Sequence, residues 1–201
     1  MNRGILISII AGVLLIGGVV AWLALRGPKL TPGDYLKNGW AFHHKQRYSN
    51  AIVTFQAGIK KYPKFGDGYD ALARSYREAK EFQKAVAAHN KAVQLNPHNF
   101  SYYWERGVTH LRMNDHDSAI NDFEMCVDKN DECANCHVGM AMAYRNQGKL
   151  AEAVAAHNKA IALSPERPDF YWERCVTYRQ KGDRALADAD LATARRLGFP
   201  H

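Results

Sequence analysis

The chain has 201 residues, of which 47% are hydrophobic, and a formal net charge of +7. This length allows one sizeable domain with an appendage. Arg3, Arg26 and Lys29 precede the first acidic residue, which leaves 24 of the 27 basic residues against 20 acidic ones in the rest of the chain. That mild excess is ordinary for a soluble domain beside an anionic membrane surface. There is no basic run and no nucleic-acid motif, which argues against nucleic acid as a partner.

The first predicted element is a helix over about residues 4–25, with the sequence GILISIIAGVLLIGGVVAWLAL and no charged side chain. A helix of 22 residues is about 33 Å long, enough to cross a hydrocarbon core of about 30 Å. The run is too long for a cleaved signal peptide, and no clean A-x-A cleavage site follows it. The sequence therefore predicts a single-pass membrane protein, with residues 1–31 forming an anchor and short linker in contact with the lipid bilayer.

The orientation of this anchor is poorly specified by charge. Arg3 precedes the apolar run and Arg26 and Lys29 follow it, so the positive-inside rule leans slightly towards a cytoplasmic C-terminal domain. A short N-terminal tail, however, commonly stays inside the cell. On balance the prediction leans weakly towards an extracytoplasmic, periplasmic domain.

From residue 32 onward, the same residue types recur every 34 positions. An unbroken alanine column illustrates the spacing: Ala51, Ala85, Ala119, Ala153 and Ala187. An aromatic column runs through Tyr35, Tyr69, Tyr103, His137 and Tyr171, and a small-residue column through Gly39, Ala73, Gly107, Ala141 and Cys175. A longer offset of 68 residues relates AVAAHNKAVQLNP, from residue 85, to AVAAHNKAIALSP, from residue 153. Repeats of this length indicate stacked supersecondary units.

This order of aromatic, small, aromatic and alanine positions, with prolines closing three units, resembles the tetratricopeptide repeat (TPR) family, whose unit has 34 residues. The resemblance covers everything after the anchor, as a domain of residues 32–201 with five units: 32–65, 66–99, 100–133, 134–167 and 168–201. It implies two antiparallel helices in each unit. We therefore expect an all-α protein, in which the transmembrane helix precedes a right-handed α-solenoid of five helix-turn-helix units.

The segment DECANCHVGM, residues 131–140, contains the motif C-x-x-C-H at Cys133, Cys136 and His137. This is the pattern by which c-type haem is attached, through two thioethers and the adjacent histidine. In the repeat register, His137 falls in the first aromatic column, where a packed histidine is ordinary for TPR sequences. We therefore favour a disulfide or free thiols, without a cofactor. The alternative is a membrane-tethered c-type cytochrome, an electron carrier.

A zinc site is less favoured, because two thiolates and one histidine lack a fourth ligand. The other two cysteines, Cys126 and Cys175, occupy small-residue columns and are expected to be small buried side chains. No catalytic spacing, H-E-x-x-H motif or glycine-rich phosphate loop is present, and His43 and His44 form the one adjacent histidine pair. We expect neither enzymatic activity nor a metal site.

The resemblance to TPR proteins implies that the first helix of each unit lines a concave face that binds extended ligands. The residues expected on that groove are Trp40, Arg74, Arg77, Trp104, Met142, Arg145, Trp172 and Arg179. Tryptophan and arginine dominate binding hot spots, and arginine pairs with carboxylates. We predict a scaffold that binds a protein or peptide with apolar and acidic groups, for assembly or docking of a membrane or envelope complex. A blander interpretation is that some of the tryptophans pack between units.

Overall fold

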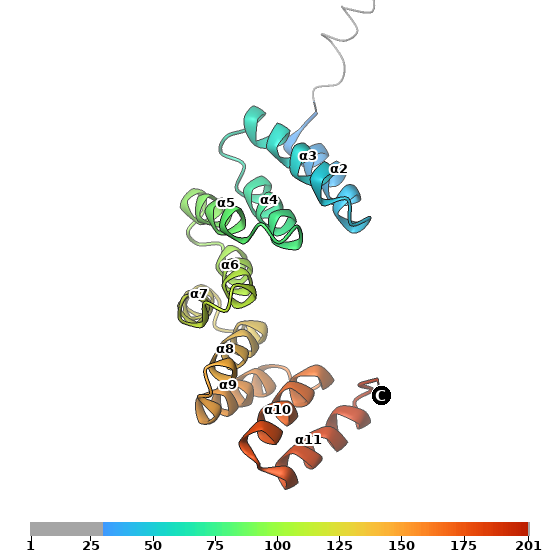
Figure 1. Cartoon of the computed structure of the whole chain (residues 1–201), viewed down its shortest axis with the longest axis vertical. Helices are drawn as coiled ribbons and strands as arrows, with labels where there is room; N and C mark the ends of the chain where they lie inside the picture. Colours follow the sequence, from blue (N-terminus) through green and yellow to red (C-terminus); the bar gives the residue numbers. More distant parts are fainter. Residues whose placement is uncertain (1–29, 201) are drawn as a thin grey trace, which may run out of the picture.

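The computed structural model describes residues 30–200, which are all-helical apart from short connections. The helices form five successive pairs in this part of the chain (Figure 1): α2 (Pro32–His44) with α3 (Tyr48–Lys61), α4 (Gly66–Glu78) with α5 (Phe82–Leu95), α6 (Phe100–Arg112) with α7 (His116–Lys129), α8 (Ala134–Asn146) with α9 (Leu150–Leu163), and α10 (Pro168–Lys181) with α11 (Arg184–Arg196). The prediction of an all-α solenoid is confirmed. The predicted transmembrane helix over residues 4–25 lies outside the described residues. Between residues 30 and 200, no helix has the length and apolar character needed to span a membrane.

The helix starts follow from local capping chemistry. The Thr31 side chain accepts a hydrogen bond from the Asp34 N–H, and the Asp34 carboxylate accepts one from the Thr31 N–H, a reciprocal capping box. Asn99 caps α6 by accepting from the Ser101 N–H. Proline occupies the first turn of α2 and of α10, where its missing N–H costs nothing.

The turn inside each pair uses a left-handed residue at the same repeat position. These five residues are Gln46, Lys80, Asn114, Gly148 and Gly182, with φ between 57° and 89°. Glycine adopts this conformation without a steric penalty, whereas the other three residues adopt it at some cost. The turn geometry is therefore set by the repeat.

Close packing between helices depends on the small-residue columns. All five residues of the alanine column are at most 1% exposed. A Cβ atom on Gly107 or Gly139 would lie 2.8 Å or 2.6 Å from the ring of Phe123. Phe123 itself is fully buried between them, so these two glycines make room for a large aromatic side chain.

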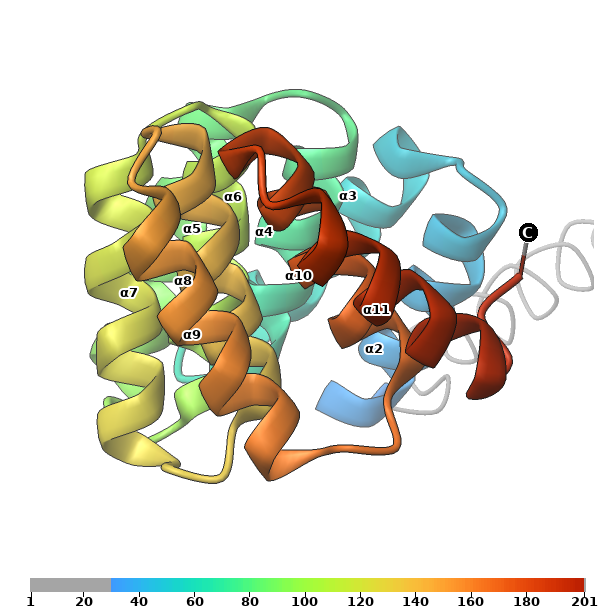
Figure 2. The same ribbon diagram turned by 90° about the horizontal axis from the view of Figure 1, so that it is seen from below.

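The curvature of the stack follows from which helices touch. The first helices of consecutive pairs contact one another, α2 with α4, α4 with α6, α6 with α8 and α8 with α10. Between residues 30 and 200, the second helices of consecutive pairs make no such contact. The first helices therefore lie on the inner, concave side, and Figure 2 shows how the pairs wind along the stack.

Candidate functional site

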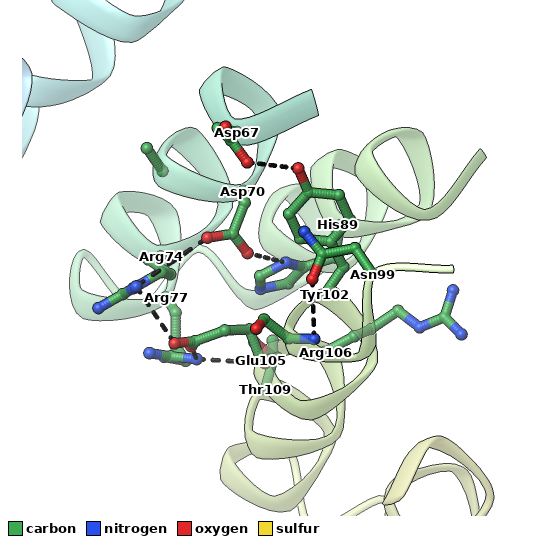
Figure 3. Close-up of polar contacts among 12 residues, drawn as sticks. Asp67, Asp70, Arg74, Arg77, His89, Asn99, Tyr102, Glu105, Arg106 and Thr109 are labelled. Atoms are coloured by element: carbon green, nitrogen blue, oxygen red, sulfur yellow. Dashed lines mark hydrogen bonds and ion pairs between the residues drawn. The ribbon is translucent and has the colours of Figure 1, made fainter. Parts of the chain in front are cut away.

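The concave face begins with charged side chains on α4 and α6 (Figure 3). Arg77 donates to the Glu105 carboxylate at 2.8 Å and to the Glu105 carbonyl at 3.2 Å. The Arg77 side chain is 9% exposed. The sequence-based expectation that Arg77 lies free on the groove is therefore wrong. Its charge joins two neighbouring units, because a buried guanidinium requires a paired carboxylate.

Arg145 repeats this arrangement one block later. It donates to the Glu173 carboxylate at 2.8 Å and to the Glu173 carbonyl at 3.3 Å, and its side chain is 14% exposed. Like Arg77, it joins first helices of neighbouring units, here α8 and α10. Its predicted exposure on the groove is also corrected, for the same reason.

Arg74 is the arginine of this region that reaches the groove surface. Its side chain is 37% exposed, its guanidinium carbon lies 4.6 Å from the centroid of the Trp40 ring, and its Nη1 lies 3.3 Å from the Glu105 carboxylate. Trp40 also packs edge-on against the buried Phe55 at 5.5 Å. Trp40 is thus part core and part platform for a cation.

Further along the groove, the lining becomes apolar. A hollow of about 430 Å³ lies between α6, α8 and α10, and Trp104, Val108, Val138 and Met142 line it together with Arg112. Trp104 also borders a second hollow that contains Arg74 and Glu105. The structure therefore brings the predicted residues Trp104 and Met142 together, with Arg74 on the adjoining side of Trp104.

The remaining predicted groove residues lie on α10. The Trp172 ring stacks on Phe199 from the segment after α11, with ring centroids 5.0 Å apart and an interplanar angle of 16°. This contact covers part of Trp172 with the chain's own residues. Arg179, near the end of α10, is exposed.

Two buried ion pairs were not found from sequence. Arg106 makes two hydrogen bonds to one Asp122 oxygen at 3.1 Å and 2.6 Å and one to the other at 2.9 Å. Arg174 makes a bidentate pair with Asp190 at 2.8 Å and 2.7 Å. The two pairs lie 68 residues apart, so the sequence offered a signal: the recurrence of arginine and aspartate at the same separation in both blocks.

The histidines of the consensus columns differ in their surroundings. His89 is fully buried, and its Nδ1 lies 3.3 Å from the Asp70 carboxylate, as Figure 3 shows. His157, the equivalent residue in the second block, is fully buried beside Val138-bearing α8 and has Arg145 and Arg174 nearby. Burial, with smaller repulsion from these two arginines, lowers the pKa of His157 to about 3.

The three cysteines near C-x-x-C-H lie together. Cys133 is the N-cap of α8, Cys136 lies in its first turn, and Cys126 comes from the last turn of α7. Cys126 and Cys136 are fully buried, and the Cys136 sulfur contacts both other sulfurs. Cys126 is buried, as its column predicts, but it is also part of a thiol cluster that the sequence analysis missed. Cys175 lies apart as a buried free thiol.

His137 is separated from this cluster. Its imidazole lines a hollow between α7, α8 and α9 with Met140 and Tyr144, and burial lowers its pKa. The Cys136 sulfur is turned towards Cys126 instead of towards solvent. The geometry therefore gives no support to the haem alternative, which stays a prediction.

Comparison with known proteins agrees with the repeat pattern. A model of the TPR repeat matches residues 73–114 and 141–182. The chain is 26% identical over 118 residues to the small glutamine-rich tetratricopeptide repeat-containing protein 2 of Mycosarcoma maydis, covering 59% of this chain and 34% of that protein. It is 23% identical over 129 residues to the mitochondrial import receptor subunit TOM70 of Rattus norvegicus, covering 64% of this chain and 21% of that protein. The chain thus spans about a third or less of the length of these relatives.

A solved structure shows the same fold. YrrB, described as a TPR protein with an unusual peptide-binding site, has a TM-score of 0.65 at 17% identity, over 89% of this chain and 92% of YrrB. The strict 34-residue recurrence, the five helix pairs and the matching repeat model lead to one conclusion. The chain belongs to the tetratricopeptide repeat family.

Proposed function

We propose that this chain is a membrane-anchored scaffold, not an enzyme, that binds an extended segment of a protein partner in its concave groove. Such binding would serve the assembly or docking of a membrane or envelope complex. The observation that carries the proposal is the apolar hollow on the groove between α6, α8 and α10. Solenoids use this face for extended ligands, and apolar hollows lined by a tryptophan are typical anchor sites for a partner side chain.

The two 68-residue blocks support this assignment by what differs between them. Asp70 and Arg74 on α4 correspond to Val138 and Met142 on α8. In the first block these positions form an ion-pair network with Glu105. In the second block they are apolar and line the hollow, so the groove there has no internal ion pair at these positions and presents apolar side chains to a ligand.

The charged groups on the rim define the second requirement for a partner. Arg112 lines the hollow with a side chain that is 56% exposed, and its guanidinium is 3.9 Å from Glu78. Arg74, at 37% exposed, borders the adjoining hollow. The partner segment we propose carries a large apolar residue for the hollow and an acidic residue next to it, because arginine binds carboxylates in bidentate fashion.

Membrane anchoring is supported by the uncharged run of residues 4–25. An anchor concentrates the groove at the bilayer, so a modest intrinsic affinity suffices for a partner held in the same membrane. We place the repeat domain on the extracytoplasmic side, as the short N-terminal tail favours.

The test is site-specific photo-crosslinking in membranes of the native host. A photoreactive phenylalanine replaces Met142 in the groove or, as a control, Val53, which is 65% exposed on α3. We expect a discrete adduct from position 142 only, identified by mass spectrometry as an apolar and acidic segment of one protein. We also expect the adduct to disappear when Val138→Arg fills the hollow. Equal adducts from both positions, or an adduct insensitive to Val138→Arg, would refute groove binding.

A further inference from the structure

A group of three sulfur atoms lies at the junction between the third and fourth helix pairs. The Sγ atoms of Cys126, Cys133 and Cys136 all lie within 4.8 Å of one another, and those of Cys126 and Cys133 are 3.6 Å apart. One sulfur forms at most one disulfide, so no pairing uses all three thiols. A single bound ion, in contrast, uses all three at once. Metal–thiolate bonds of about 2.3 Å place three sulfurs about 4 Å apart around one ion.

The surroundings of the cluster select the class of ion. Within residues 30–200, the group includes no histidine nitrogen and no carboxylate oxygen. The side chains packed against it are apolar: Val93, Phe100, Trp104, Met125 and Val127. Purely thiolate ligands in an apolar setting favour soft ions such as Cu(I) or Zn(II) and disfavour Mg²⁺ or Ca²⁺.

The position of the cluster on α8 also suits negatively charged sulfur. Cys133 is the N-cap residue, and its Sγ accepts a hydrogen bond from the Cys136 N–H at 3.3 Å. The N-terminus of a helix stabilises negative charge through its free N–H groups and its dipole. Cys133 is half-buried and borders the groove hollow that contains Arg74 and Trp104, which gives an ion a path to the otherwise buried thiols.

We propose that Cys126, Cys133 and Cys136 form a three-thiolate site for one thiophilic metal ion of the Cu(I) or Zn(II) class. Cu(I) is the better fit, because three thiolates complete its coordination, whereas Zn(II) takes a fourth ligand. The ion would bind α7 to the start of α8 and so fix the junction between two repeats. This site is separate from the groove function and stands or falls independently of it.

The repeat itself supplies conservative variants for the test. Cys126 occupies a column that holds Ala92 and Ala160 in other units, so Cys126→Ala is expected to fold. Cys133 occupies the position of Asn99, the N-cap of α6, so Cys133→Asn exchanges the thiol for a side chain that already caps an equivalent helix. The control is Cys175→Ala, which changes a distant buried thiol in a column that holds Ala73 and Ala141.

The experiment uses the detergent-purified full chain, reduced and kept anaerobic. It is titrated with Cu(I) or with Zn(II) in the presence of a chromophoric chelator, and bound metal is measured by mass spectrometry after desalting. We expect about one ion per chain, a thiolate-to-metal charge-transfer band with Cu(I), and a rise in melting temperature on binding. All three signals should be lost in Cys126→Ala and Cys133→Asn and kept in Cys175→Ala. Stronger retention of Cu(I) than of Zn(II) would support three-coordinate binding, and retention of Zn(II) alone would overturn that choice of ion.

Two outcomes would overturn the proposal as a whole. The first is retention of neither ion by the reduced wild-type chain. In that case, recovery of a disulfide among the three cysteines after exposure to air would identify the cluster as a dithiol pair with a third thiol. The second is unchanged metal binding by Cys126→Ala, with circular dichroism showing that the variant is folded.

Discussion

Replacing His157 with phenylalanine should remove much of the acid sensitivity of the folded domain. His157 is fully buried, and burial, aided by Arg145 and Arg174, lowers its pKa from 6.5 to about 3. Below pH 6.5 the unfolded chain therefore binds a proton that the folded chain does not bind until about pH 3. The free energy of unfolding must fall as the pH falls through this window. Phenylalanine already occupies the equivalent position at residues 55 and 123, so the variant is expected to pack.

The magnitude follows from linkage. One pH unit within the window corresponds to about 1.4 kcal/mol. Between pH 7 and pH 5, His157 alone should therefore reduce the free energy of unfolding by about 2 kcal/mol. His43 and His137, whose pKa values are also lowered by burial, contribute a further loss of the same sign that His157→Phe leaves in place.

The assay is urea denaturation of the detergent-solubilised chain, followed by tryptophan fluorescence at pH 7 and pH 5. A second variant sharpens it. Val138→Asp places a carboxylate at the position equivalent to Asp70, which lies 3.3 Å from His89. An adjacent carboxylate favours the protonated imidazole, so this variant should raise the pKa of His157 and also reduce the acid sensitivity. An identical loss of stability between pH 7 and pH 5 in wild type and His157→Phe would refute the assignment.

Three further substitutions test the packing, the turns and the buried ion pairs by the same denaturation assay at pH 7. Gly139→Ala should cost about 1–3 kcal/mol through overpacking, because its Cβ would lie 2.6 Å from Phe123; no loss would mean that the ring moves freely. Gly148→Ala should cost about 1 kcal/mol from backbone strain alone, since φ is +76° with nothing within 4 Å; a larger loss would indicate an unrecognised contact. Asp122→Ala should cost about 3 kcal/mol by leaving the part-buried Arg106 unpaired, and a second change of Arg106 to methionine should recover part of that loss.

The fold was predictable because the features that determine it recur at a fixed spacing. Helices begin at residues 32, 66, 100, 134 and 168, in step with the 34-residue pattern. The alanine column is buried in every unit, because helix backbones approach most closely there. Even the left-handed turn position recurs where its residue is Gln46 or Lys80, so the repeat position predicts it better than residue type does.

The candidate site was less predictable, because its contacts join residues from different units. Arg77 stands in a column expected to face the groove, and its partner Glu105 lies 28 positions away on the next first helix. Column position alone does not show whether an arginine meets a carboxylate or solvent. The signal was the same separation between Arg145 and Glu173. The thiol cluster was missed for a related reason: Cys126 was read only by its column, although the turn after α7 returns the chain to the sulfur atoms of α8.

The duplicated blocks separate what the fold needs from what the groove offers. Both blocks keep the arginine–glutamate pair between first helices and the arginine–aspartate pair beneath it. Each of these pairs buries charge and is costly to break one partner at a time. The groove-facing positions differ, charged at Asp70 and Arg74 and apolar at Val138 and Met142. Since the same frame forms with either set, the frame does not require the apolar one. The hollow at Trp104 is therefore the part of the groove where a partner, and not the fold, best accounts for the residues present.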